Sequence, residues 1–118
     1  MMRPTQEVTV YLHRQPVDFR KAINGLSLIV QENMKLNLYS EALFVFINKN
    51  RTKLKFLYWE RNGFCLWQKR LEKNKFAWPR HLEDDTVQLR TQELNWLLDG
   101  FDIWRMPPHQ TLFYDCVG

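Results

Sequence analysis

Three strand-like runs separated by two short turns constrain the fold of this chain more than any other feature. Residues 43–47 (LFVFI) are apolar on both faces, which is typical of a strand inside a sheet. Residues 53–59 alternate in part, and residues 64–71 form the third run. The turn sequences are NKNR and RNG, and Asn-Gly is a strong hairpin signal. The pattern predicts a three-stranded antiparallel meander over residues 43–71.

One helix is predicted before the meander in the sequence and another after it. Apolar residues recur at three- and four-residue spacing over residues 19–34, and Asp18 is placed to cap the N-terminus of that helix. A second apolar stripe predicts a helix over residues 91–99, with Gly100 as the residue that ends it. These elements predict an α+β fold, an antiparallel sheet packed by one N-terminal and one C-terminal helix.

Shorter signals complete the predicted fold. Residues 8–12 (VTVYL) alternate β-branched and aromatic side chains, which predicts an opening strand. Residues 76–78 and 86–89 are candidates for two further short strands. The length of 118 residues predicts a single globular domain, residues 1–118, with a core that needs no disulfide or metal.

Cysteine usage and hydropathy predict the compartment. Cys65 and Cys116 are far apart and form no C-x-x-C pair, so we expect free thiols in a reducing cytoplasm. No segment has the apolar length of a signal peptide core or a membrane span. We therefore expect a soluble cytoplasmic protein with no membrane partner.

Positive charge is concentrated in one segment. Residues 49–80 contain ten Lys/Arg and two Glu, a net charge of +8, whereas the whole chain carries +4 and the remainder therefore −4. Such segregation indicates an acidic partner, and Lys/Arg arrays beside aromatic rings are typical of nucleic-acid binding. The alternative is a solvated sheet surface whose charges prevent edge pairing.

The candidate nucleic-acid contacts are basic residues of this segment, two cations near Asp18, and two tryptophans beside basic residues. They are Arg20, Lys21, Lys49, Arg51, Lys53, Lys55, Trp59, Lys69, Arg70, Lys73, Lys75 and Trp78. Strand parity places Lys53, Lys55 and Lys69 on one face with Trp59, whereas Lys49, Arg51, Lys73 and Lys75 lie in turns. The array is thus a basic rim around an aromatic sheet, which favours contacts to the DNA backbone over sequence readout. Other interpretations are that the tryptophans belong to the core, and that Asp18 is a cap beside two solvated cations.

The sequence does not bring together the kinds of residues that catalysis requires. Metal-dependent phosphoryl transfer needs convergent carboxylates, but the acids fall into an early and a late set, and Glu83-Asp84-Asp85 is typical of a solvated loop. The three histidines have no metal-ligand spacing, and no nucleophile motif or phosphate loop is present. We therefore predict a non-enzymatic protein without a metal or cofactor.

Four segments resemble a known protein family that bacterial insertion sequences encode. They are VTVYL, DFRKAINGL, the stretch from Leu43 to Pro79 and VQLRTQELNWLLDG, which together cover about nine-tenths of the chain. The pattern includes Lys55, Trp59, Gly63, Leu66 and the Lys69-Arg70-Leu71-Glu72 string, followed by Phe76, Trp78 and Pro79. It is similar to the small TnpB-type accessory protein, which is distinct from the RNA-guided nuclease of the same name. The departures are Ala22 followed by Gly25, and Glu60-Arg61-Asn62-Gly63 in place of an Asp-Gly turn.

The resemblance implies a role that assists transposition, with the catalytic transposase on a separate chain. Two hypotheses remain: a DNA-binding accessory protein, or an adaptor that docks onto the transposase without contacting DNA. The second predicts an exposed aromatic patch formed by Trp104 with Leu112, Phe113 and Tyr114. The oligomeric state stays open.

Overall fold

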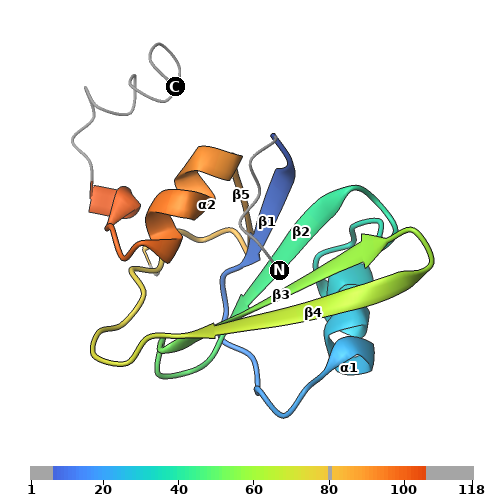
Figure 1. Ribbon diagram of the computed structural model, residues 1–118, viewed down its shortest axis with the longest axis horizontal. Coiled ribbons are helices and arrows are strands. Elements are labelled where there is room, and N and C mark those ends of the chain that lie inside the picture. Colours follow the sequence, from blue (N-terminus) through green and yellow to red (C-terminus); the bar gives the residue numbers. More distant parts are fainter. Residues whose placement is uncertain (1–6, 80, 106–118) are drawn as a thin grey trace.

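A five-stranded mixed sheet forms the centre of the structure (Figure 1). The computed structural model describes residues 7–79 and 81–105. The strands are β1 (Thr9–His13), β2 (Ala42–Ile47), β3 (Lys53–Glu60), β4 (Gly63–Arg70) and β5 (Thr86–Leu89). Their order across the sheet is β4-β3-β2-β1-β5. The predicted meander is confirmed as β2, β3 and β4, and the predicted α+β class is confirmed with it.

The sheet is mixed because β1 runs parallel to β2, whereas every other pair of neighbours is antiparallel. Parallel neighbours need a long crossover connection, and the first helix lies in that connection. The prediction of an antiparallel sheet was therefore wrong for the pairing of β1 with β2, although it is confirmed for the strands of the meander. The short strand at residues 86–89 is confirmed, but residues 76–78 form no strand, and Phe76 and Trp78 are buried without one.

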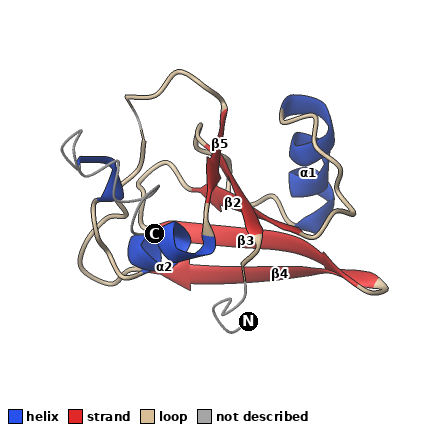
Figure 2. Ribbon diagram, turned by 90° about the horizontal axis from the view of Figure 1, so that it is seen from above, coloured by secondary structure: helices blue, strands red, loops and turns tan. Residues whose placement is uncertain are grey.

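Each face of the sheet has its own apolar core. All six residues of β2 are buried, which confirms its central position. One core joins Val45 and Phe56 to Leu94 and Leu97 of the second helix, and the other joins Phe44 to Leu26 of the first helix. The two helices lie well apart, with strands of the sheet between them (Figures 1 and 2). In the described part of the chain, no helix is long and apolar enough to cross a membrane.

The first helix begins later than its apolar pattern predicted. α1 spans Ile23–Leu28 and continues as one π-helical stretch over Ile29–Asn33. The N-cap residue is Ala22 and has no side-chain cap, so the prediction of Asp18 as the cap was wrong. The Asp18 carboxylate instead accepts from the backbone N–H and the guanidinium of Arg20. This local bonding competes with helix formation and leaves residues 18–22 as a loop.

The second helix, α2 (Thr91–Leu98), ends as its sequence predicted. Gly100 has φ of +94°, the left-handed conformation that glycine adopts without strain. The N–H of Gly100 donates to Leu97 O at 3.0 Å, and the N–H of Phe101 donates to Trp96 O at 3.1 Å. These two bonds form a Schellman motif, which satisfies carbonyls that the helix end would otherwise leave unpaired.

Buried His13 predicts a pH dependence of stability. Its ring is 6% exposed, packs 5.8 Å from the Phe46 ring, and donates from Nδ1 to Gln15 O. Burial lowers the His13 pKa from 6.5 despite the raising effects of Gln15 and Asp85. A lowered folded pKa means that the unfolded chain binds more protons, so stability is complete above about pH 6.5 and falls as pH decreases through that value.

We therefore expect the free energy of unfolding in urea to fall between about pH 7 and pH 5.5, a range in which exposed carboxylates stay ionised. The His13→Asn variant keeps a donor near the Nδ1 position but does not titrate. Its free energy of unfolding should therefore change less with pH over this range. Equal slopes in the two proteins would contradict the assignment.

Candidate nucleic-acid interface

The predicted basic sheet face does not form, because the hairpin register separates its lysines. β3 and β4 are joined through Arg61 and Asn62, and Glu60 pairs with Gly63. Each odd-numbered residue of β3 therefore faces an even-numbered residue of β4, so Lys53 lies opposite Arg70 and Leu54 opposite Lys69. Paired residues share a face of the sheet. Lys53 and Lys55 are consequently on the α1 side, while Lys69 is on the α2 side.

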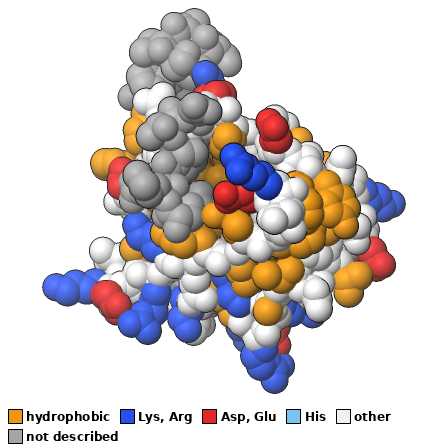
Figure 3. Space-filling view, turned by 45° about the vertical axis from the view of Figure 1, so that its right-hand side comes forward, with side chains coloured by type: hydrophobic (Ala, Val, Ile, Leu, Met, Phe, Trp, Pro, Cys, Tyr) orange, Lys and Arg blue, Asp and Glu red, His pale blue; other side chains and the backbone are white. Residues whose placement is uncertain are grey.

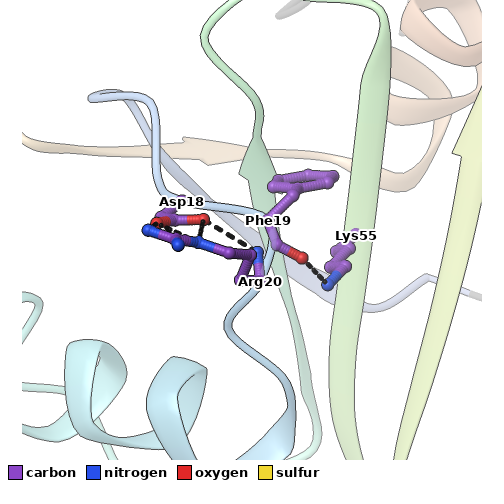
Figure 4. Close-up of polar contacts among 4 residues, drawn as sticks. All are labelled: Asp18, Phe19, Arg20 and Lys55. Carbon is purple, nitrogen blue, oxygen red and sulfur yellow. Dashed lines mark hydrogen bonds and ion pairs between the residues drawn. The ribbon is translucent and has the colours of Figure 1, made fainter.

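Lys55 is buried and anchors the loop at residues 18–22 (Figure 4). Its Nζ donates to Phe19 O at 2.9 Å and to Lys21 O at 2.7 Å, and it lies 4.9 Å from the centroid of the Phe19 ring. Burial is the main cause that lowers the Lys55 pKa, and the charge of Lys53 adds to it. With its ammonium committed to two backbone carbonyls, Lys55 is a structural residue in this protein.

The same loop carries two predicted contacts, Arg20 and Lys21. The Arg20 guanidinium forms an exposed ion pair with Asp18, with Nη2 and Oδ2 separated by 2.6 Å. Hydrogen bonds from Arg20 lower the Asp18 pKa to about 2. The positive charge of Arg20 is therefore offset by its neighbour. Lys21 is exposed, beside the same carboxylate.

Lys69 and Arg70 also make intramolecular contacts. Lys69 Nζ donates to Leu98 O at 2.9 Å, so this cation sits at the C-terminus of α2, where the helix dipole favours positive charge. Arg70 forms an ion pair with Glu72, with an N–O distance of 3.0 Å. Both side chains therefore have partners within the protein itself.

The two tryptophans proposed as stacking platforms have different surroundings. Trp78 is 6% exposed, and its indole N–H donates to Arg14 O at 2.8 Å. Trp59 packs edge-on against Tyr39 at 5.0 Å and against Phe64 at 4.9 Å between ring centroids. These three rings form an aromatic cluster beside the β3–β4 turn. We call this region, Tyr39, Trp59 and Phe64, the aromatic end.

The remaining predicted cations gather at the opposite end of β3. The loop after β4 is bonded to the β2–β3 turn, since Leu71 N–H donates to Thr52 O and Phe76 N–H donates to Arg51 O, each at 2.8 Å. These bonds place five cations on adjoining backbone segments. We call this set the basic end; it comprises Lys49, Arg51, Lys53, Lys73 and Lys75.

Asn48 organises the turn that carries Lys49 and Arg51 and leads into Lys53, the first residue of β3. Its Oδ1 accepts from the N–H groups of Thr52 and Lys53, and its Nδ2 donates to Thr52 Oγ1. Arg51 occupies the left-handed region with φ of +62°. An L residue there costs about 1–2 kcal/mol relative to the right-handed region, and glycine is the usual choice. Sequence reasoning identified the turn here but missed the role of Asn48.

No ion pair forms within the described residues for any cation of the basic end, whereas Arg14, Arg20, Arg70 and Arg90 each pair with a carboxylate. A hollow of about 260 Å³ lies between the turn and Arg14, lined also by Gln15, Pro16, Lys49, Arg51 and Trp78. Arg14 was not among the predicted contacts. Its guanidinium bonds the carbonyls of Asp84 and Glu83 and so ties the acidic loop to β1.

Hydrophobic side chains form a patch on one face of the molecule. Figure 3 shows this face, on which most of the visible Lys and Arg project around the margin, while one basic side chain lies in the middle beside acidic ones. Within the described residues, no three His, Cys, Asp or Glu side chains come together as a metal site would require. Cys65 is a free thiol, while Cys116 and the tail residues Leu112, Phe113 and Tyr114 lie outside the described residues.

Comparisons with known proteins identify the family. The family described as "IS66 Orf2 like protein" matches residues 8–108. An uncharacterised protein of Sinorhizobium fredii, y4hO, is 36% identical over 107 residues, which cover 91% of each chain. A second uncharacterised protein of that organism, y4jC, is 32% identical over 106 residues and 90% of each chain. No solved structure matches. The resemblance inferred from the sequence is confirmed: the chain belongs to the IS66 Orf2-like family, and that membership supports an accessory role in transposition.

Proposed function

We propose that this protein binds DNA non-catalytically during transposition, and that the basic end makes the contact. One observation carries the proposal: five cations without an ion pair in the described structure lie on two bonded backbone segments. Unneutralised Lys and Arg side chains bind phosphates by releasing condensed counterions. The other predicted cations support this binding less, because Lys55, Lys69, Arg20 and Arg70 have intramolecular partners.

The hydrogen bonds that fix the backbone at the basic end also favour it as the DNA contact site. Asn48 and the bonds to Thr52 O and Arg51 O hold the two segments in place before any ligand arrives. A preorganised set of charges loses less conformational entropy on binding than the same charges on a mobile tail.

The salt dependence of DNA affinity tests this proposal. If all five cations contact phosphates, the slope of log affinity against log salt should approach about −4.5, at about 0.9 per phosphate. Fluorescence anisotropy between about 50 and 200 mM salt measures the slope. Affinity that does not change with salt, or no binding to DNA at all, would contradict the proposal.

Two arginine-to-glycine variants locate the contact. Arg51→Gly and Arg61→Gly remove the same charge from left-handed positions in two different turns, with φ of +62° and +53°. Glycine relieves the strain in both, so both variants should be at least as stable as the parent. We expect Arg51→Gly to weaken DNA binding and to reduce the slope by about 1, while Arg61→Gly changes neither appreciably.

The adaptor hypothesis has a specific structural observation in its favour. Tyr39 is 57% exposed at the aromatic end, where it covers Trp59 and Phe64. Trp104, which the sequence placed in the docking patch, is half-buried and donates its indole N–H to Ala77 O. If the protein docks onto the transposase, Tyr39→Ala should reduce their nuclease-resistant co-purification and leave DNA affinity unchanged.

A further inference from the structure

We propose that β4 pairs with β4 of a second copy of this chain, antiparallel and with Leu66 on the two-fold axis. The order of the sheet makes β4 an edge strand, and one side of its eight residues has no neighbouring strand in the described structure (Figures 1 and 2). An open edge of this length is a template for a further strand. Such pairing does not require DNA.

The register of the hairpin identifies the backbone groups that face the open edge. Thr52 and Leu71 continue that register, and the N–H of Leu71 donates to Thr52 O at 2.8 Å. They are therefore a hydrogen-bonded pair, and such pairs alternate with non-bonded ones along an antiparallel ladder. The odd-numbered residues of β4 consequently bond to β3. The N–H and C=O groups that point outward belong to Phe64, Leu66, Gln68 and Arg70.

The edge of β4 lacks the features that usually keep edge strands from pairing. Its sequence, GFCLWQKR, contains no proline, and its residues pair one to one with those of β3 without a bulge. Its two cations have partners within the protein, since Lys69 donates to Leu98 O and Arg70 pairs with Glu72. Prolines, bulges and solvated lysines are the common protection of an edge. The backbone of β4 is therefore open to another strand.

A second copy of β4 fits this edge through its own sequence. Only even-numbered residues can bond across the interface, so the numbers of two paired residues must add up to an even sum. With Leu66 opposite Leu66, Lys69 of one copy faces Gly63 of the other, which has no side chain to repel it. A shift by one bonded pair toward the turn would instead place Lys69 opposite Arg61, and like charges directly opposite are destabilising.

A hollow beside Leu66 favours the same register. It has a volume of about 450 Å³ and is lined by Leu66 and by residues 22–25 at the start of α1. Leu66 is half-buried and packs against the core that contains α1. Directly opposite residues share a face of the sheet, so Leu66 of the second copy would lie next to this hollow and cover it. A shift away from the turn would bring Gln68 there instead, and less apolar surface would be buried.

Repulsion between two positively charged copies does not prevent this pairing. Antiparallel pairing about Leu66 separates the two Arg70 residues by about eight positions along the strands, which corresponds to about 27 Å. The Debye length is about 10 Å at 0.1 M salt, so repulsion over that distance is largely screened. The basic ends, which include Lys73 and Lys75 beyond Arg70, would lie at opposite ends of the paired strands.

Sedimentation equilibrium of the nuclease-treated full chain tests the pairing. We expect the mass to approach twice 14.4 kDa at concentrations on the order of 100 µM and to rise no further, because both copies use the same edge. Gln68→Pro should stay at the mass of one chain, since it removes an N–H that faces the edge and no bond to β3. Gln68→Ala keeps that N–H and should dimerise as the parent does.

Cross-linking tests the register without relying on the proline variant. In Cys116→Ser, the half-buried free thiol Cys65 is the one remaining cysteine. The proposed register makes the two Cys65 residues diagonal neighbours, about 7–8 Å apart, so a bismaleimide with a spacer of about 8 Å should join two chains.

The mass of one chain at every concentration would overturn the proposal, and so would assembly beyond two copies. A dimer that survives in folded Gln68→Pro would show that the contact is elsewhere. A dimer that the bismaleimide does not link through Cys65 would contradict the register about Leu66.

Discussion

Reversing two charges at the basic end, in the variant Lys49→Glu/Arg51→Glu, is expected to weaken DNA binding by on the order of 100-fold at low salt. Each charge-assisted contact contributes about 1 kcal/mol or more, and each new carboxylate repels phosphate in addition. The substitutions should preserve the fold, because Lys49 is exposed and the turn is held by Asn48 and backbone bonds. Fluorescence anisotropy gives the affinity, and circular dichroism verifies the fold.

The matched control reverses one lysine and one arginine at the other end of the molecule. In Lys35→Glu/Arg61→Glu, both residues are exposed and in left-handed turns, and the net charge changes equally. If long-range attraction alone drives binding, both double variants should lose affinity to the same extent. Contact at the basic end predicts a loss at least about tenfold larger for Lys49→Glu/Arg51→Glu. Equal losses would remove the basic end as the contact site.

Lys55→Met is expected to reduce the free energy of unfolding by about 2–4 kcal/mol. Methionine retains the aliphatic packing of the lysine stem but removes the donor to two backbone carbonyls, and each unpaired buried acceptor costs about 1–3 kcal/mol. The 2.9 and 2.7 Å bonds to Phe19 O and Lys21 O hold the loop at residues 18–22 against β3. Urea denaturation measures the loss. Hydrogen exchange at the Lys21 amide, which donates to Asp18 O, should accelerate as the loop detaches.

Lys53→Met provides the control on the same strand and face, two positions away. Lys53 is half-buried and makes no ion pair within the described residues, so its replacement should change stability by less than about 0.5 kcal/mol. A similar loss in both variants would mean that the effect comes from the lost strand charge. Only a large difference between the two supports anchoring of the loop by Lys55.

The sequence predicted correctly those structural features that depend on residues close to one another in the chain. The meander follows from apolar runs separated by turn residues, and Gly100 follows from the conformation that a helix end requires. The first helix illustrates the limit of this local reasoning. Its apolar stripe extends over residues 19–34, but Lys55, distant in sequence, binds the carbonyls of Phe19 and Lys21 and keeps them out of the helix.

The face of the sheet on which Lys69 lies could have been predicted from the sequence, but counting odd and even positions alone gave the wrong face. Counting odd and even positions grouped Lys69 with Lys53 and Lys55. A hairpin with Arg61 and Asn62 as its loop pairs odd residues with even ones, so Lys69 falls on the opposite face. The turn sequence contained this register, because loop length decides which residues face each other.

Sequence by itself determined the family, the α+β class and the segment in which positive charge accumulates, because all three depend on residue order and composition. The tertiary structure alone decided which cations remain available for a partner. Lys55, Lys69 and Arg70 have carbonyls or a carboxylate within bonding distance, whereas Lys49, Arg51, Lys73 and Lys75 form no ion pair in the described structure. Whether a charge is neutralised depends on atoms brought near it by folding, and no spacing in the chain specifies those distances.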